Sequence, residues 1–222
     1  MQTMSHHLRL LAISVMLPVA IITARPATAV EPEAARALVQ TAAADMLDSY
    51  AGKTLSRADA HAAMQRLVDR YCDMGVESQQ ILGRYWTRAT HAQQQEFEGL
   101  LERFFVTAVG GMIDGVSANQ HITVQGADRD GDRVVVHSLA FVPNKPAVVV
   151  HWVVMDGSAG KPVIVDVSAD GVGLVATLSA DFTAVLRASA GQLEGLFDPL
   201  RKKVTGLAVP QEAAAAPLQS AK

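Results

Sequence analysis

The sequence predicts an α+β fold in which N-terminal helices, an antiparallel meander sheet and C-terminal helices follow one another. Apolar residues recur at helical spacing over residues 33–105 and again over residues 174–200, whereas strand-like runs are confined to the segment between them. Helices and strands are therefore grouped along the chain and do not alternate as in a parallel βαβ protein.

Two amphipathic helices begin the predicted domain. Residues 33–50 are rich in alanine and carry larger apolar side chains at helical spacing. Ser56 and Asp59 have the spacing of a helix start, which predicts a second helix over residues 56–71. Each helix has one apolar stripe, so each is expected to pack on a neighbour.

A short helical stretch and a long helix are predicted next. Residues 81–86 form the short stretch, and Thr90 with Gln93 makes a capping-box start for the helix that follows. The apolar stripe of this helix continues to Phe105. Because glycine weakens a helix, we expect the pair at residues 110–111 to end or loosen it.

The sheet is predicted between the two groups of helices. A strand at residues 121–124 leads through a turn to valine-rich runs at residues 134–142, 147–155 and 162–167. A half-buried antiparallel strand alternates apolar with polar residues, but these runs are apolar on both faces. Helices, a second sheet or a ligand are therefore expected against the second face.

Two further helices and a tail complete the chain. Helical spacing resumes at residues 174–186 and 193–200, and the basic residues 201–203 that follow are typical of a helix C-terminus. Residues 205–222 contain an alanine run and two prolines without a core-forming pattern. We therefore predict a disordered tail there.

The first 29 residues have the organisation of a secretory signal peptide. Arg9 gives a positive start, an apolar stretch covers residues 10–22, and Ala27-Thr28-Ala29 fits cleavage after Ala29. Pro18 interrupts the stretch, which is shorter than the ~20 residues that cross a membrane. We expect export to the periplasm and one mature domain over residues 30–204.

Charge, cysteine content and motifs exclude several function classes. The chain has 19 basic and 22 acidic residues, and removing residues 1–29 takes away two arginines, which leaves 17 basic residues and a net charge of −5. An acidic surface disfavours nucleic acid as a partner. Cys72 is the only cysteine, so no internal disulfide forms. The sequence has no metal-hydrolase, serine-hydrolase or nucleotide-binding motif, so it marks no catalytic residue and no metal ligand.

Two segments are similar to the MlaC family, also called toluene-tolerance auxiliary proteins. The first resembles the family's Leu-Gly-Arg-Tyr-Trp stretch and consists of Ile81-Leu82-Gly83-Arg84-Tyr85-Trp86, then Thr90 and Phe97. The second resembles its Asp-Val, Gly-Val-Ser-Leu and terminal-helix pattern and consists of Asp166-Val167, Gly171-Val172-Gly173-Leu174-Val175, Phe182, Gly191, Leu193, Leu196 and Leu200. The likeness covers residues 36–203.

The resemblance implies a soluble periplasmic lipid carrier. Proteins of this family bind phospholipid in an apolar cavity between sheet and helices and serve a system that maintains outer-membrane lipid asymmetry. The implied partners are a phospholipid, an inner-membrane ABC-type transporter complex and an outer-membrane lipoprotein complex. A bound lipid is expected, with no cofactor.

The chain departs from the family pattern at several positions. Gly173 stands where the family commonly has Ser, and Leu178-Ser179 stand where it has Tyr-Arg. Gly160-Lys161-Pro162 occupies the turn where a Trp is usual. Because an arginine can bind a phosphate headgroup, its loss leaves open a carrier for hopanoid or another non-phospholipid lipid.

The cavity implied by the resemblance has candidate wall residues on helices and on strands. For Arg84, the alternatives are a contact with a lipid phosphate at the cavity mouth and an ordinary solvent-facing or structurally paired arginine. The predicted lipid-binding residues are Arg84, Tyr85, Trp86, Phe104, Phe105, Val134, Val136, Val148, Val150, Trp152 and Leu174.

A different function class rests on two histidines and an aspartate. His137 and His151 lie on consecutive predicted strands, and with Asp166 they are compatible with a metal site or an acid–base group in a small isomerase or dehydratase. The hairpin register decides whether His137 faces His151 or Trp152. A third alternative is an interaction module that binds no lipid.

Overall fold

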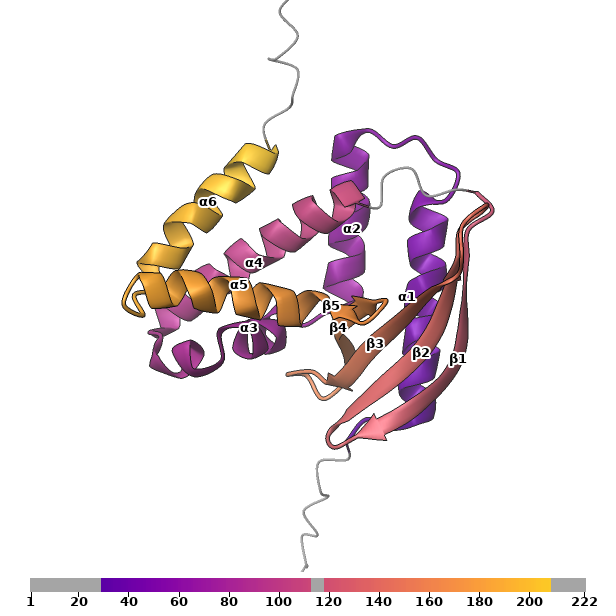
Figure 1. Cartoon of the computed structure of the whole chain (residues 1–222), viewed down its shortest axis with the longest axis horizontal. Coiled ribbons are helices and arrows are strands. Elements are labelled where there is room, and N and C mark those ends of the chain that lie inside the picture. The colour runs from indigo at the N-terminus through magenta and orange to yellow at the C-terminus, as the bar shows by residue number, and fades with distance from the viewer. Residues whose placement is uncertain (1–28, 113–117, 209–222) are drawn as a thin grey trace, which may run out of the picture.

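The helical and strand-like segments fold in the predicted order, as helices, then a sheet, then helices (Figure 1). The computed structural model describes residues 29–112 and 118–208. None of the helices in these ranges is long and apolar enough to cross a membrane. The helices are α1 (Pro32–Tyr50), α2 (Arg57–Tyr71), α3 (Met74–Leu82), the 3₁₀ helix η1 (Gly83–Arg88), α4 (His91–Met112), α5 (Leu174–Ala188) and α6 (Glu194–Ala208).

One antiparallel sheet with the strand order β1-β2-β3-β4-β5 lies beside these helices. Consecutive strands pair with each other, so the sheet is a simple meander. The predicted α+β class is thereby confirmed. The strands are β1 (His121–Asp130), β2 (Arg133–Phe141), β3 (Val148–Asp156), β4 (Pro162–Ala169) and β5 (Val172–Gly173).

One face of the sheet, called the inner face here, packs on α1. Val134 and Val136 of β2 point to this face and are fully buried, at 0% exposure. They share a hydrophobic cluster with Ala35, Val39 and Ala42 of α1. The inner face and the apolar stripe of α1 therefore form one core.

The opposite, outer face of β2 and β3 is only half-buried. Val135, Leu139 and Val153 keep accessible surface there, and Val149 is 42% exposed. Helices α3 and α5 pack against β4. The expectation that the valine-rich runs are covered on both faces is therefore wrong for β2 and β3. Valine is favoured in strands whether or not it is buried, which explains the pattern.

The helices α3, α4, α5 and α6 form a second core, away from β1 (Figure 1). The Phe97 ring lies 6.0 Å from the Phe182 ring in an edge-to-face contact and 6.1 Å from the Phe197 ring. All three rings are buried. Aromatic pairs at these distances stabilise a core beyond the area they bury.

Of two predicted helix ends, one is close and one is wrong. Helix α4 runs to Met112, one residue past the glycine pair that was expected to end or loosen it. Helix α6 continues beyond the basic residues 201–203 to Ala208. Residues 205–208, which the sequence placed in a tail, belong to this helix.

Arg201 has a different role from the predicted one. Its guanidinium forms ion pairs with Glu96 of α4 and with Glu194 and Asp198 of α6. The charge is thus matched by carboxylates within α6 and across to α4, not by the helix C-terminus. The predicted signal peptide and the rest of the tail, residues 1–28 and 209–222, lie outside the described residues.

Replacing Phe97 by alanine should destabilise the protein by about 3–5 kcal/mol, because the change leaves a cavity among buried rings. Phe141→Ala is the matched control, since Phe141 is only half-buried and stacks on His121 at the edge of the sheet. Denaturant unfolding of both variants measures the difference. Equal losses in the two variants would show that Phe97 is not central to the helical core.

Candidate functional site

The strand residues predicted to bind lipid all lie on the inner face of the sheet. Val134 and Val136 are fully buried, and Val150 and Trp152 are at least nine-tenths buried. Val148 keeps accessible surface and packs at the edge of the same cluster. The structure thus brings these five residues together in the core that α1 covers.

A hydrogen-bonded serine fixes the tryptophan on this face. The indole N–H of Trp152 donates to Oγ of Ser138 at 2.9 Å, and that hydroxyl donates to the carbonyl oxygen of Val150 at 3.1 Å. Ser138 is 1% exposed. A buried polar group without a partner is costly, so this chain of bonds holds the ring in one orientation. Sequence reasoning missed Ser138 because strand position alone does not reveal such a bond.

The predicted helix residues belong to the other core. Tyr85, Phe104 and Phe105 are buried among α3 to α6, and Trp86 and Leu174 pack at the edge of that cluster. They do not share a hydrophobic cluster with the strand residues. The structure therefore divides the predicted set between the two cores.

Arg84 is exposed at the start of η1. Its guanidinium carbon lies 5.1 Å from the centre of the Tyr85 ring, and Nη2 donates to the Tyr85 hydroxyl at 3.3 Å. Among the described residues it forms no ion pair with a carboxylate. The phosphate contact suggested for Arg84 stays a prediction.

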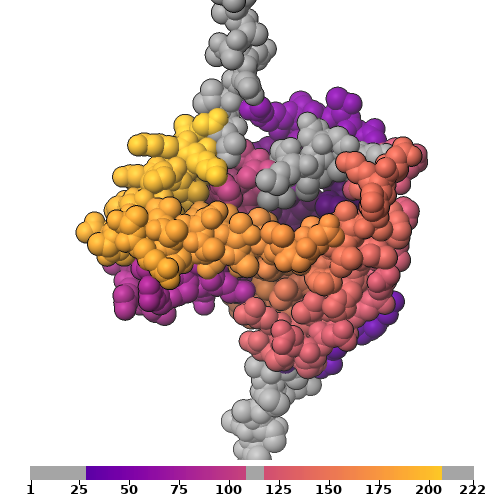
Figure 2. Space-filling view, in the orientation of Figure 1, coloured from indigo at the N-terminus to yellow at the C-terminus, as the bar shows by residue number. Residues whose placement is uncertain are grey.

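The inner-face core is not sealed from solvent. Figure 2 shows a hollow beside the sheet and above α5, with indigo atoms of the N-terminal part of the chain at its base. Several apolar side chains that pack on this core remain partly accessible. They are Leu38, Leu67, Ile122, Val124, Val148 and Val167.

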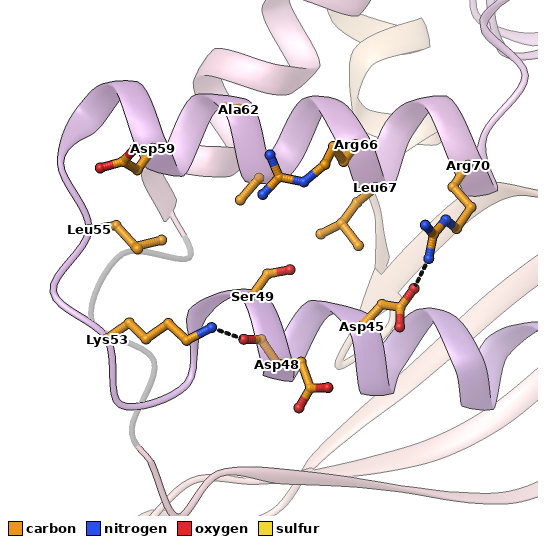
Figure 3. Close-up of a pocket in the computed structure, with 11 residues that line it drawn as sticks. Asp45, Asp48, Ser49, Lys53, Leu55, Asp59, Ala62, Arg66, Leu67 and Arg70 are labelled. Carbon is orange, nitrogen blue, oxygen red and sulfur yellow. Dashed lines mark hydrogen bonds and ion pairs between the residues drawn. The ribbon is translucent and has the colours of Figure 1, made fainter.

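A separate pocket of about 460 Å³ lies between α1 and α2 (Figure 3). Leu55, Ala62, Ala63 and Leu67 give it an apolar floor. Charged and hydroxyl side chains surround the floor, namely Asp45, Asp48, Ser49, Lys53, Asp59, Arg66 and Arg70.

One end of this pocket is closed by an ion pair. Arg70 donates to the Asp45 carboxylate at 2.5 Å, and the Tyr71 hydroxyl donates to the same oxygen at 2.5 Å. The hydrogen bond from Tyr71, with the Arg70 charge, lowers the pKa of Asp45. Asp45 is therefore a satisfied anion.

Glu77 is a buried acid between the two cores. It is 2% exposed, and burial raises its pKa to about 8 despite a hydrogen bond with the Cys72 thiol, which acts in the opposite direction. The negative charges of Asp166 and Asp73 raise it further. At pH 7 Glu77 is therefore mostly protonated and neutral.

The two histidines lie on the outer face of the sheet. His137 pairs directly with His151, and Trp152 pairs with Val136, which decides the register that the sequence left open. The two rings are 4.8 Å apart, and Nε2 of His137 lies 2.9 Å from Asp128. No group of three potential metal ligands occurs among the described residues.

The family assignment follows from a comparison with protein-family models. The model described as MlaC protein matches residues 36–202, three-quarters of the chain. The chain belongs to the MlaC family. The similarity first seen in two short segments therefore extends over both helical groups and the sheet.

A solved structure resembles this MlaC-family chain. It is the phospholipid-binding protein from Ralstonia solanacearum, determined in complex with a phospholipid. The two are 25% identical with a TM-score of 0.66, and the match covers 79% of this chain and 99% of that chain. No curated protein sequence matches the chain.

The glycine that departs from the MlaC pattern makes room for a helix cap. Oδ1 of Asp166 accepts from the backbone N–H groups of Val167 at 2.8 Å and Val175 at 2.9 Å, so it satisfies the first turn of α5. A Cβ atom on Gly173 would lie 3.0 Å from Oδ2 of Asp166. Asp166 on β4 thus caps the N-terminus of α5, which is the role that a serine at position 173 would have.

The second departure from the MlaC pattern, Leu178-Ser179, lies where α5 contacts α3. The Ser179 hydroxyl donates to the carbonyl oxygen of Ile81 at 3.0 Å, where α3 ends, and Leu178 is buried in the helical core. Both positions therefore stabilise the packing of α5 on α3. Neither supplies a cation for a headgroup.

The Ser138–Trp152 bond can be tested with a double-mutant cycle. Ser138→Ala should cost about 1–3 kcal/mol, because it leaves the buried indole N–H without an acceptor. Adding Trp152→Phe should recover part of that loss, since the phenyl ring has no donor. Chemical denaturation of the four proteins measures the coupling, and strictly additive losses would contradict the bond's importance.

Protonated Glu77 should make stability depend on pH. Because the folded pKa of about 8 exceeds the ordinary value of 4.5, its contribution is complete below pH 4.5 and is lost as the pH rises through 8. The full difference is on the order of 5 kcal/mol. Glu77→Gln should flatten the fall in unfolding free energy between pH 5 and pH 9.

Glu33→Gln is the control for this pH test, because Glu33 is exposed on the first turn of α1. That variant should retain the slope of the unmodified protein. Retention of the same slope by Glu77→Gln would show that Glu77 ionises normally in the folded state.

Proposed function

We propose that this protein is a soluble periplasmic carrier that shields the acyl chains of a phospholipid and moves it between membranes. The supporting observation is the match to the phospholipid-bound Ralstonia protein, over 79% of the chain, in a member of the MlaC family. We infer that the accessible apolar side chains beside the inner face receive the acyl chains.

The chemistry of the inner face suits hydrocarbon. Apart from Ser138, the side chains in its core are apolar, and the Ser138 hydroxyl is already bonded. An acyl chain placed there would bury its methylenes without leaving a protein polar group unsatisfied. Arg129, a charged side chain that lies opposite Val134 on this face, is paired with Glu31 at the start of α1, so we infer that the headgroup lies outside the apolar core.

Energetics require a carrier of this kind to transfer its lipid by contact. Burial of one methylene is worth ~0.8 kcal/mol, so two chains with about 30 methylenes oppose release into water by on the order of 20 kcal/mol. We infer that the lipid is exchanged with an inner-membrane ABC-type transporter complex and an outer-membrane lipoprotein complex.

The placement of the histidines favours a carrier over an isomerase or dehydratase. His137 and His151 lie on the outer face, opposite the face that carries Trp152. One oxygen of Asp166 already accepts two backbone N–H groups. An acid–base group formed by these residues would not be inside the apolar interior.

Native mass spectrometry of residues 30–222, purified from the periplasm, tests the carrier function. The expected result is one protein with a stoichiometric phospholipid, named by extraction and lipid analysis. A hopanoid or sterol-like lipid would shift the cargo to the alternative class. A protein that stays empty after incubation with phospholipid vesicles would contradict the proposal.

A pair of valine variants locates the lipid. Val148→Trp puts a large side chain on the inner face and should lower phospholipid occupancy severalfold. Val149→Trp is the matched control. Val149 is the next residue along β3, and its side chain lies on the outer face and is 42% exposed. Lipid extraction and quantification from both variants provide the measurement. Equal occupancy would place the acyl chains elsewhere.

A further inference from the structure

The pocket between α1 and α2 is distinct from the inner-face core in size and polarity. Its volume of about 460 Å³ falls in the range of roughly 300–1,000 Å³ typical of small-molecule sites. Its charged and hydroxyl walls suit a small polar molecule better than an acyl chain.

Arg66 provides the available charge in this pocket. Its side chain runs along α2 toward Ala62 in Figure 3, and the residue is exposed. Within the described part of the chain it forms no hydrogen bond and no ion pair. A guanidinium presents several donors in a planar fork that matches phosphate and carboxylate oxygens.

The carboxylates that line the pocket do not neutralise Arg66. Asp45 accepts from Arg70 and Tyr71, and Asp59 accepts from the Ser56 hydroxyl at 2.7 Å in the cap of α2. The Asp48 carboxylate points away from α2 (Figure 3). Arg66 therefore has no carboxylate partner among the residues that line the pocket, where three acidic and three basic side chains balance.

Two further groups complete an anion site. The Ser49 hydroxyl points from α1 toward α2 in Figure 3 and forms no hydrogen bond within the described residues. Lys53 donates to the carbonyl oxygen of Asp48 at the pocket rim and keeps its positive charge. Leu55 and Leu67 lie beside them and offer apolar contact to a short carbon chain.

We propose that this pocket binds a phosphate ester with a short aliphatic part, such as a glycerol phosphate group. Arg66 binds the phosphate oxygens, Ser49 donates a hydrogen bond to them, and the carbon atoms lie on Leu55 and Leu67. The ligand is either a free phosphate ester or the headgroup region of a phospholipid. The site does not depend on where the acyl chains bind.

Titration calorimetry with two probes tests the site. sn-Glycerol 3-phosphate represents the free ester, and a phosphatidylglycerol with short chains, kept below its critical micelle concentration, represents the lipid source. Arg66→Gln should weaken binding about tenfold or more, because a charge-assisted pair is lost. Ser49→Ala should weaken it severalfold, and Arg66→Lys should restore part of it.

Arg88→Gln is the matched control, since Arg88 is an exposed arginine on η1, outside the pocket. It should bind both probes like the unmodified protein. Dependence on Arg66 for both probes indicates a site for free esters, and dependence for the lipid alone indicates a headgroup subsite; either supports the proposal.

The proposal is overturned if neither probe binds, or if Arg66→Gln binds both as tightly as Arg88→Gln does. Failure of this site is distinguishable from failure of the carrier function. If the protein retains stoichiometric lipid in native mass spectrometry but its binding of the probes does not depend on Arg66, the carrier function stands and only the proposal for this pocket is contradicted.

Discussion

The contact between α1 and the inner face of the sheet is the constraint on which the rest of the structure depends. Four long strands about 4.8 Å apart make a sheet roughly 15–20 Å wide, whereas a helix with its side chains is about 10–12 Å across. One helix therefore cannot cover the face. Ile122, Val124 and Val148 on this face stay partly accessible.

The remaining helices stabilise the molecule without filling that space. Phe97, Phe182 and Phe197 give α4, α5 and α6 a core of their own, and Arg201 joins α6 to α4 through Glu96. A single core formed by all the helices would have closed over the sheet. Division into separate clusters is compatible with both a stable fold and an incompletely filled interior.

Local signals predicted much of the fold. Ser56 and Thr90 begin helices as expected, since each hydroxyl accepts from a backbone N–H three residues later. Other features of the fold depend on contacts between residues far apart in the sequence and could not be predicted. Arg201 is paired across helices with the Glu96 carboxylate of α4, and the cap of α5 comes from Asp166 on a neighbouring strand. Neither is visible in a short window of sequence.

For the candidate site residues, too, the local sequence pattern predicted some placements and tertiary structure decided the others. Strand parity places Val134 and Val136 on one face of β2, because side chains alternate strictly along a strand, but it does not relate that face to Trp152 on β3. The register of His137 could not be derived, since it depends on the hairpin geometry. The pocket between α1 and α2 also escaped detection, because its residues are ordinary surface charges until the two helices are placed side by side.

The hydrogen bonds of Asp166 and Ser179 have a mechanical consequence. Asp166 fastens the start of α5 to β4, and Ser179 fastens its middle to the end of α3. The two bonds thereby link α5 to both β4 and α3. Helix α1 faces the sheet mainly through small apolar side chains, with an ion pair from Glu31 to Arg129 at its N-terminal end. Its far end is tied to α2, because Asp45 accepts from Arg70 and Tyr71 and the Tyr50 hydroxyl donates to the carbonyl oxygen of Ala60. A displacement of α1 from the sheet would therefore carry α2 with it.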